Sequence, residues 1–205
     1  MSDADSIAFS ELAEVNPRVS LQAYDDDLAV SFISMSDVSE GGKWTTRKER
    51  RLGDVRFGYT AFLESDLLFA KITPCMENGK GAHVTGMKNG IGCGSTEFHV
   101  LRAKGANNAR YLHHWLQASM TRIKAIAYMG GSAGQQRVQA QFFDRYRVPK
   151  LSPTEQCQAA TILDTADEAI SKTEAVIAKL RQVRTGLTHD LLTCGLDENG
   201  HLRDR

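Results

Sequence analysis

Residues 152–193 read SPTEQCQAATILDTADEAISKTEAVIAKLRQVRTGLTHDLLT, a run whose one proline is Pro153 and whose one glycine is Gly186. Ser152 and Glu155 have the spacing of a capping box with proline at the first helical position, so a helix is predicted to begin here. Gly195 is the predicted stop, because glycine commonly ends a helix in the left-handed conformation. A helix of about 39 residues is about 58 Å long at 1.5 Å per residue.

Apolar side chains recur along this helix with the seven-residue spacing of a coiled coil. One seam position holds Leu163, Ile170, Ile177, Arg184 and Leu191, and its partner position holds Ala166, Thr173, Leu180 and Leu187. The stripe exceeds what a domain of this size covers with its own core, which predicts a partner helix. The two polar seam residues weaken the seam but can fix its register. A helix packed wholly on its own domain is the alternative.

The residues before this helix show mixed periodicity. Strands are predicted at 30–35, at 66–72 and at 97–102, the last from its alternation of polar and apolar residues. The glycine-rich stretch from Gly79 to Gly94 is expected to be turns and irregular loop. These patterns are typical of a mixed α/β domain.

The last part of this domain shows a helical pattern of apolar residues, followed by a segment rich in aromatic residues. Leu112, Trp115, Leu116, Ser119, Ile123 and Ile126 have helical spacing, which predicts one amphipathic helix over 108–127. The chain from Phe142 to Pro149 is expected to close the globular part. The predicted fold class is α+β, with a globular domain at 1–150, a long coiled-coil helix at 151–195 and a tail at 196–205.

The formal net charge is zero, with 25 Lys and Arg against 25 Asp and Glu. At face value this excludes a strongly basic nucleic-acid-binding protein. The charge is unevenly distributed, however, with net values of −8 over 1–40, +4 over 41–60, −1 over 61–100, +8 over 101–150 and −3 over 151–205. Such a chain can present a basic face to phosphates while it stays neutral overall. The alternative is that the blocks interleave in space and cancel.

The composition indicates an ordinary globular protein of the cytoplasm. Hydrophobic residues make up 41% and charged residues 24% of the 205 residues. We expect no membrane association, since no apolar run approaches the roughly 18 residues of a span. The N-terminus has acidic residues where a signal peptide is basic. The four cysteines form no C-x-x-C pair and are expected to be free thiols.

Catalytic motifs are weak throughout the chain. His113 and His114 are adjacent, so on a helix they point in different directions and do not share a metal. Cys75 and His83 could form a nucleophile and base, but a cysteine directly after Pro74 is more typical of packing. The glycine clusters lack the order of a phosphate-binding loop. No catalytic residue, metal site or cofactor is therefore predicted.

The basic residues are better candidates for function. The run Lys43-Trp-Thr-Thr-Arg-Lys-Glu-Arg-Arg51 suits phosphate oxygens and base edges, with contacts expected from Lys43, Thr45, Thr46, Arg47, Lys48, Arg50 and Arg51. Asn78-Gly-Lys80 and Gln135-Gln-Arg137 lie near glycines, in loops whose side chains could enter a DNA groove. Base readout is therefore assigned to Asn78, Lys80, Gln135, Gln136 and Arg137. A solvated charged face is the alternative for the basic run.

Several segments together resemble a known family. Residues 66–81, DLLFAKITPCMENGKG, and residues 94–102, GSTEFHVLR, resemble the target recognition domain of type I restriction-modification specificity (S) subunits. The stretch from 143 to 149, the SPTEQ motif at 152–156 and LTHDLLT at 187–193 are similar to that family's junction into its spacer helix. The resemblance covers nearly the whole chain and adds Lys71 to the expected DNA contacts.

The resemblance implies a protein without catalysis of its own. In that family each recognition domain reads one half of a split site in double-stranded DNA, and a long helix separates the halves. Methyltransferase (M) and restriction (R) subunits supply the chemistry. Typical S subunits carry two recognition domains and two spacer helices, whereas this chain has one of each, so we expect a natural or truncated half subunit.

The unmatched apolar stripe then predicts a homodimer. Antiparallel packing of residues 154–193 from two copies buries the stripe in a closed two-fold contact. Such a dimer reads an inverted repeat whose half-sites lie about 10 bp apart. The expected interface residues are Leu163, Ala166, Ile170, Thr173, Ile177, Leu180, Leu187 and Leu191. Two other function classes stay open: a coiled-coil interaction module without DNA binding, and a thiol enzyme that uses Cys75.

Overall fold

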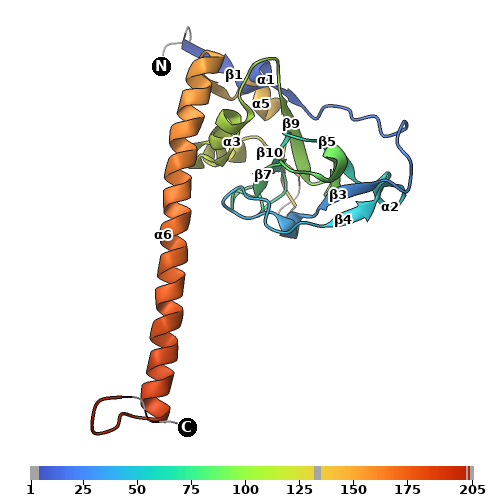
Figure 1. Ribbon diagram of the computed structural model, residues 1–205. Coiled ribbons are helices and arrows are strands. Elements are labelled where there is room, and N and C mark those ends of the chain that lie inside the picture. Colours follow the sequence, from blue (N-terminus) through green and yellow to red (C-terminus); the bar gives the residue numbers. More distant parts are fainter. Residues whose placement is uncertain (1–4, 132–134, 202, 204–205) are drawn as a thin grey trace. The chain divides into compact units, whose positions relative to one another are not determined.

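Helix α6, Pro153–Thr193, is the longest element of the computed structural model and confirms the predicted long helix (Figure 1). The backbone N–H of Ser152 donates to Glu155 Oε2 at 2.8 Å, and the backbone N–H of Glu155 donates to Ser152 Oγ at 3.3 Å. This is the expected capping box. At the other end Gly195 has a φ of 70°, and its N–H donates to the carbonyl of Leu191 at 3.1 Å. Both ends of the helix were therefore predictable from local sequence.

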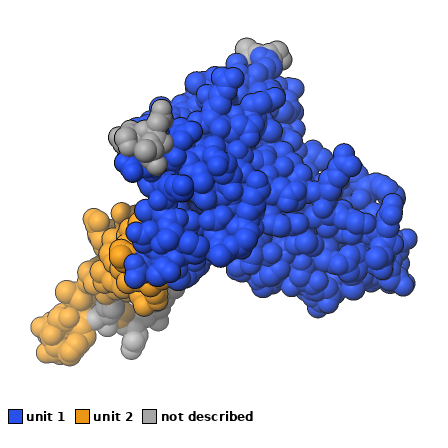
Figure 2. All heavy atoms as spheres, turned by 90° about the horizontal axis from the view of Figure 1, so that it is seen from above, with its two compact units in different colours: residues 1–160 blue, residues 161–205 orange. Residues whose placement is uncertain are grey.

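The structure describes residues 5–131, 135–201 and 203, which form two compact units, residues 1–160 and 161–205 (Figure 2). The units divide within α6, and Gln156 and Ala160 of its first two turns are buried in the first unit. The division by function into 1–150, 151–195 and 196–205 remains a proposal.

Two four-stranded sheets form the frame of the first unit (Figure 1). One is antiparallel throughout, in the order β2 (Ala13–Val15), β9 (Phe98–Ala103), β6 (Leu67–Ala70) and β7 (Gly81–His83). The other has the order β4 (Glu49–Arg51), β3 (Ala29–Ile33), β8 (Ile91–Gly94) and β5 (Thr60–Leu63), with β3 and β8 parallel. A mixed α/β domain followed by a long helix is the fold class that the sequence predicts.

Shorter elements complete the first unit. Two pairs of strands are β1 (Ser6–Ala8) with β12 (Arg147–Pro149) and β10 (Met129–Gly130) with β11 (Arg137–Val138). The helices are α1 (Phe9–Leu12), α2 (Leu52–Val55), α3 (Ala109–Gln117), α4 (Ser119–Ile126) and α5 (Gln141–Arg145), with 3-10 turns η2 (Met35–Asp37) and η3 (Lys88–Gly90). The β1–β12 pair joins the N-terminal strand to the segment that precedes α6.

The three predicted strands are present as β3, β6 and β9. The expectation of irregular loop between Gly79 and Gly94 was wrong, because this stretch contains β7 and β8. Gly92 shows the physical reason: a Cβ at this position would overlap the ring of Phe62 on the neighbouring strand β5. Glycine here allows close packing within a strand rather than a turn.

The predicted single helix over 108–127 is two helices, α3 and α4, separated at Ala118, which has extended backbone angles. The break turns Thr121 and Ala125 into the core, where Thr121 Oγ1 lies 2.6 Å from Tyr146 Oη. Ile123 and Ile126, which the helical spacing assigned to the buried face, are 61% and 49% exposed. The buried face of α4 therefore differs from the one that a continuous helix would have, because the break at Ala118 changes which residues face the core. A continuous helical pattern does not predict this break.

Aromatic rings dominate the core next to α6. Phe143 is fully buried, with its ring centroid 5.9 Å from that of Phe9, 5.7 Å from Phe69 and 5.1 Å from Phe142. The backbone N–H of Phe9 donates to the carbonyl of Tyr146 at 2.8 Å. The segment from 142 to 149 thus packs into the core of the first unit, which continues to Ala160.

Gln156 is the buried polar side chain that ties the start of α6 to the first unit. Its Nε2 donates to Asn107 Oδ1 and to the carbonyl of Leu151, each at 3.0 Å. Its Oε1 accepts from the backbone N–H of Asn108 at 2.9 Å. The side chain of Asn108 in turn caps α3.

Replacing Gln156 by methionine, which has a similar size, will lower the free energy of unfolding by about 2–3 kcal/mol, because three half-buried partners lose their hydrogen bonds. Urea unfolding followed by circular dichroism measures this loss. Gln158→Met is the matched control, since Gln158 is exposed on the same turn. Equal stability of the two variants would contradict the anchoring role.

Candidate nucleic-acid interface

The basic run from Lys43 to Arg51 consists of an ordered loop, residues 43–48, followed by strand β4. We refer to the whole run as the basic loop. The backbone N–H and the hydroxyl of Thr45 donate to the carbonyl of Asp37, at 2.9 and 3.0 Å. The indole N–H of Trp44 donates to the carbonyl of Thr46 at 2.7 Å. Lys43, Thr45 and Thr46 are exposed on this loop. The loop therefore presents polar side chains from a fixed backbone.

Arg47 and Arg50 are exposed cations held against aromatic rings. The guanidinium carbon of Arg47 lies 3.6 Å from the centroid of Trp44, and Nη1 donates to the carbonyl of Thr85 at 2.8 Å. The guanidinium of Arg50 lies 5.8 Å from the centroid of Phe32. Stacking orders a guanidinium while its edge can still bind a phosphate.

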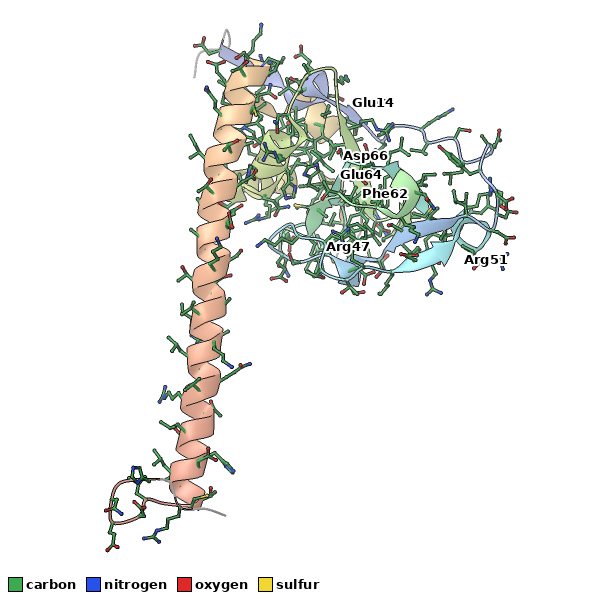
Figure 3. The ribbon with its side chains drawn as sticks, in the orientation of Figure 1. Glu14, Arg47, Arg51, Phe62, Glu64 and Asp66 are labelled. Atoms are coloured by element: carbon green, nitrogen blue, oxygen red, sulfur yellow. The ribbon has the colours of Figure 1, made fainter. Side chains whose placement is uncertain are left out.

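Acidic residues of the N-terminal block neutralise three basic residues of the segment 41–60. Lys48 pairs with Asp37, Arg51 pairs with Asp27, and Arg56 Nη2 lies 2.6 Å from Asp26 Oδ1. The alternative that charged blocks interleave and cancel is thus correct for these three pairs. Figure 3 shows Arg51 at a distance from Arg47, toward the end of β4. The local charge at Arg51 is lower than a count along the sequence indicates.

Asp37 is buried beside the basic loop. Burial acts to raise the pKa of its carboxyl, but the Lys48 ammonium and hydrogen bonds from the hydroxyl and backbone N–H of Ser34 outweigh it, so the pKa lies below its ordinary value. The ionised carboxylate therefore stabilises the loop.

Acidification will destabilise the chain in part through Asp37. Its folded pKa is below the unfolded value of about 4, so its contribution is complete above that pH and is lost as the pH falls through the folded pKa. Asp37→Asn should therefore lose less stability than the wild type between about pH 5 and pH 2.5, as urea unfolding at each pH will show. The exposed Asp144→Asn serves as control. Equal losses in all three proteins would refute this contribution.

The turn at Asn78–Lys80 rests on the same segment as the basic loop. Asn78 Nδ2 donates to Glu40 Oε1 at 2.9 Å, and Lys80 Nζ donates to the carbonyl of Met35 at 3.2 Å. Residues 35–40 thus contact both the basic loop and the Asn78–Lys80 turn, which are two of the predicted groups of DNA-contacting residues. Lys71 follows β6, and its backbone pairs with Glu97 and Val138.

The loop at 135–137 lies at the other end of the 71–80 segment. The backbone N–H of Thr73 donates to the carbonyl of Gln136 at 3.0 Å. Arg137 forms a two-pronged ion pair with Glu97, with Nε 2.9 Å from Oε2 and Nη2 2.8 Å from Oε1. This pair lowers the pKa of Glu97 and raises that of Arg137. Arg137 is thus held by Glu97, whereas the side chain of Gln135 is exposed.

Three side chains near the Asn78–Lys80 turn were missed as candidates: Glu40, Gln117 and Arg122. Arg122 Nη1 donates to the carbonyl of Gln117 at 2.6 Å, and its guanidinium lies against Gly79. Arg122 lies within the helix that the sequence predicts over 108–127, and its positive charge was the available signal. Glu40 and Gln117 gave none, because their proximity depends on how distant segments fold together.

The remaining expectations concern chemistry and membranes. Cys75 is half-buried against the core cluster that contains Ile33 and Phe98, which favours its interpretation as a packing residue. Among residues 5–131, 135–201 and 203, no three His, Cys, Asp or Glu side chains are grouped as metal ligands would be. In the same part of the chain no helix has the length and hydropathy to cross a membrane.

Comparison with curated proteins finds specificity subunits. The chain is 36% identical over 154 residues to the type I restriction enzyme EcoEI specificity subunit of Escherichia coli, a match of 74% of this chain and 26% of that protein. It is 39% identical over 142 residues to the EcoAI specificity subunit of the same organism, covering 68% and 24%. The chain therefore spans about a quarter of the length of these relatives. No protein-family model matches the chain.

Solved structures share the fold at low sequence identity. A structure that describes complex assembly and conformational transition of the type I R-M system has a TM-score of 0.70 and 16% identity, covering 95% of this chain and 50% of that chain. The HsdS subunit from Thermoanaerobacter tengcongensis has a TM-score of 0.65 and 16% identity, covering 89% and 46%. In sequence and in fold, the chain belongs to the family of type I restriction enzyme specificity subunits, of which it spans a part.

Proposed function

We propose that this chain reads one half of a bipartite sequence in double-stranded DNA. The observation that carries the proposal is its 36% identity to the EcoEI specificity subunit over 74% of the chain. The first unit supports it with stacked, exposed arginines on the basic loop and with the amide side chain of Asn78 at the adjacent turn. These are the residue types that contact phosphates and base edges.

The proposed DNA contacts are the residues that the sequence indicates, and they differ in their contacts with neighbouring side chains. Arg47 and Arg50 are ordered by aromatic rings, and Lys43, Thr45 and Thr46 are exposed beside them. Lys48, Arg51 and Arg137 contact DNA only in competition with Asp37, Asp27 and Glu97. Lys71, Asn78, Lys80, Gln135 and Gln136 complete the proposed interface.

The proposed partners supply the chemistry. Methylation and cleavage are carried out by M and R subunits that dock onto this chain, which selects the site and performs no reaction itself. The names of the relatives, which are specificity subunits of restriction enzymes, support this division of labour.

A second copy of the chain is the proposed partner of α6. Leu163, Ile170 and Ile177 are 43%, 56% and 43% exposed, and Leu180, Leu187 and Leu191 are similarly uncovered. Antiparallel packing of residues 154–193 from two copies removes this stripe from water, with Ala166 and Thr173 in the same seam. The dimer then reads an inverted repeat with an unread spacer.

Arg47→Ala should weaken binding to duplex DNA and lower the slope of log affinity against log salt by about 1, because one phosphate contact is lost. Fluorescence anisotropy at several salt concentrations measures both quantities. Arg145→Ala, an exposed arginine of α5, is the matched control. Unchanged affinity and slope in Arg47→Ala would assign the basic loop to a solvated face, whereas a wild-type chain that binds no duplex DNA would favour an interaction module.

A further inference from the structure

Three regions far apart in the sequence bring four polar side chains to one place beside β7. Glu40 comes from the loop after η2, and Asn78 comes from the turn before β7. Gln117 is the last residue of α3, and Arg122 lies in α4. We refer to these four side chains as the polar cluster.

The members of the polar cluster are held together partly by side-chain and partly by backbone contacts. Asn78 Nδ2 donates to Glu40 Oε1 at 2.9 Å, and Arg122 Nη1 donates to the carbonyl of Gln117 at 2.6 Å. Gly42, beside Glu40 in the sequence, packs directly against the side chain of Gln117. The cluster is therefore one connected surface feature, although its members come from separate elements.

Gly79 lies at the centre of these contacts. Its φ is 76°, and a Cβ at this position would lie 2.8 Å from Arg122 Nη1 and 2.9 Å from the carbonyl oxygen of Glu40. Both the left-handed backbone and the close approach require glycine. The absence of a side chain here lets Glu40 and Arg122 approach the turn that carries Asn78.

The cluster is accessible and ordered at the same time. Glu40 and Asn78 are exposed, whereas Gln117 and Arg122 are half-buried. Half-burial with fixed partners lowers the entropy that each side chain loses when it binds. Lys80, also half-buried, adds a cation at the edge of the cluster through its bond to the carbonyl of Met35.

The chemistry of the cluster matches base edges better than it matches phosphates. Asparagine and glutamine form paired hydrogen bonds with adenine, arginine does so with guanine, and a carboxylate accepts from the amino group of cytosine. A carboxylate among the contacts repels phosphate, so Glu40 argues against a role limited to the DNA backbone. The basic loop at 43–51 also contacts the segment 35–40, but its charged side chains are mainly cations, which match phosphates better than base edges.

We propose that Glu40, Asn78, Gln117 and Arg122 form the base-reading surface of this chain in the major groove, while Arg47 and Arg50 hold the phosphates beside it. The inference rests on the proposed function. It adds Glu40, Gln117 and Arg122 to the residues that determine which sequence is recognised. It also separates the residues that read the sequence from those that supply affinity.

The test is selection of bound duplexes from a randomised pool by the purified full chain and its variants. The wild type should enrich one motif. Glu40→Gln, Gln117→Ala and Arg122→Ala should each lower discrimination at one or two base pairs by about tenfold while the rest of the motif persists. Arg47→Ala should lower affinity for all sequences and leave the motif unchanged.

Matched controls come from the same kinds of element. Lys124→Ala removes a cation from α4 that lies 5.6 Å from the ring of Tyr146, outside the cluster. Gln141→Ala removes an exposed glutamine from α5. Neither should change the motif. Thermal unfolding of each variant identifies loss of fold, and Glu40→Gln, at an exposed position, keeps the test informative if a half-buried position is not tolerated.

The outcomes separate the inference from the function on which it rests. A wild-type motif that all three cluster variants retain overturns the base-reading cluster and leaves the proposed function intact. A wild type that enriches no motif overturns both. A motif altered at different positions by different cluster variants, and by neither control, supports the inference.

Discussion

Replacing Ile170 and Ile177 by aspartate will dissociate the proposed homodimer into monomers at micromolar concentrations. These side chains are 56% and 43% exposed in the single chain. The proposed dimer buries both of them from each copy, four side chains in total, in its antiparallel seam. Burial of each large aliphatic side chain contributes about 1.5–3 kcal/mol, so the association constant should fall more than about 1,000-fold. Sedimentation velocity over a concentration series measures the change.

Positions on the opposite side of α6 provide the control. Ala175→Asp and Gln182→Asp add the same charge to the same helix outside the seam and should leave the dimer intact. A wild-type chain that sediments as a monomer at tens of micromolar would contradict the homodimer. So would a double variant of Ile170 and Ile177 that stays dimeric.

Phe143→Ala will lower the free energy of unfolding of the first unit by about 3–5 kcal/mol, the cost of truncating a buried aromatic side chain and leaving a cavity. Phe143 is fully buried, and its ring packs among Phe9, Phe69 and Phe142. The loss is a large part of the stability of a typical domain. Guanidinium unfolding monitored by circular dichroism measures it.

Phe57→Ala is the matched control, because Phe57 is 82% exposed and its truncation should change the free energy of unfolding by less than about 0.5 kcal/mol. Losses of similar size in both variants would show that the ring cluster around Phe143 does not dominate the core. A loss confined to Phe143→Ala would support its central place between α5, α1 and β6.

Features set by neighbouring residues could be predicted from the sequence. The capping box at Ser152 and Glu155 and the left-handed Gly195 fixed both ends of α6, because each signal acts within one turn of helix. Features set by distant segments could not. The break at Ala118 accompanies the packing of Thr121 against Tyr146, 25 residues away, and β8 accompanies the close approach of Phe62 to Gly92.

The same limit applies to the candidate interface. The sequence indicated the basic loop and the Asn78–Lys80 turn, since residue type and local glycines carry that signal. It did not show that Asp27 holds Arg51 or that Glu97 holds Arg137, because these partners are 24 and 40 residues away. Pairing of this kind decides which cations are available for the proposed DNA contacts, and it is settled by the tertiary fold.

Selection of bound DNA by the unmodified chain tests the central claim most directly. A pool of duplexes with randomised sequence is incubated with the purified chain at moderate salt, and the bound fraction is sequenced. We expect two copies of one short motif in inverted orientation, separated by a spacer of fixed length and free sequence. Bound DNA with no enriched motif, or no bound DNA at all, would contradict recognition of DNA sequence by this chain.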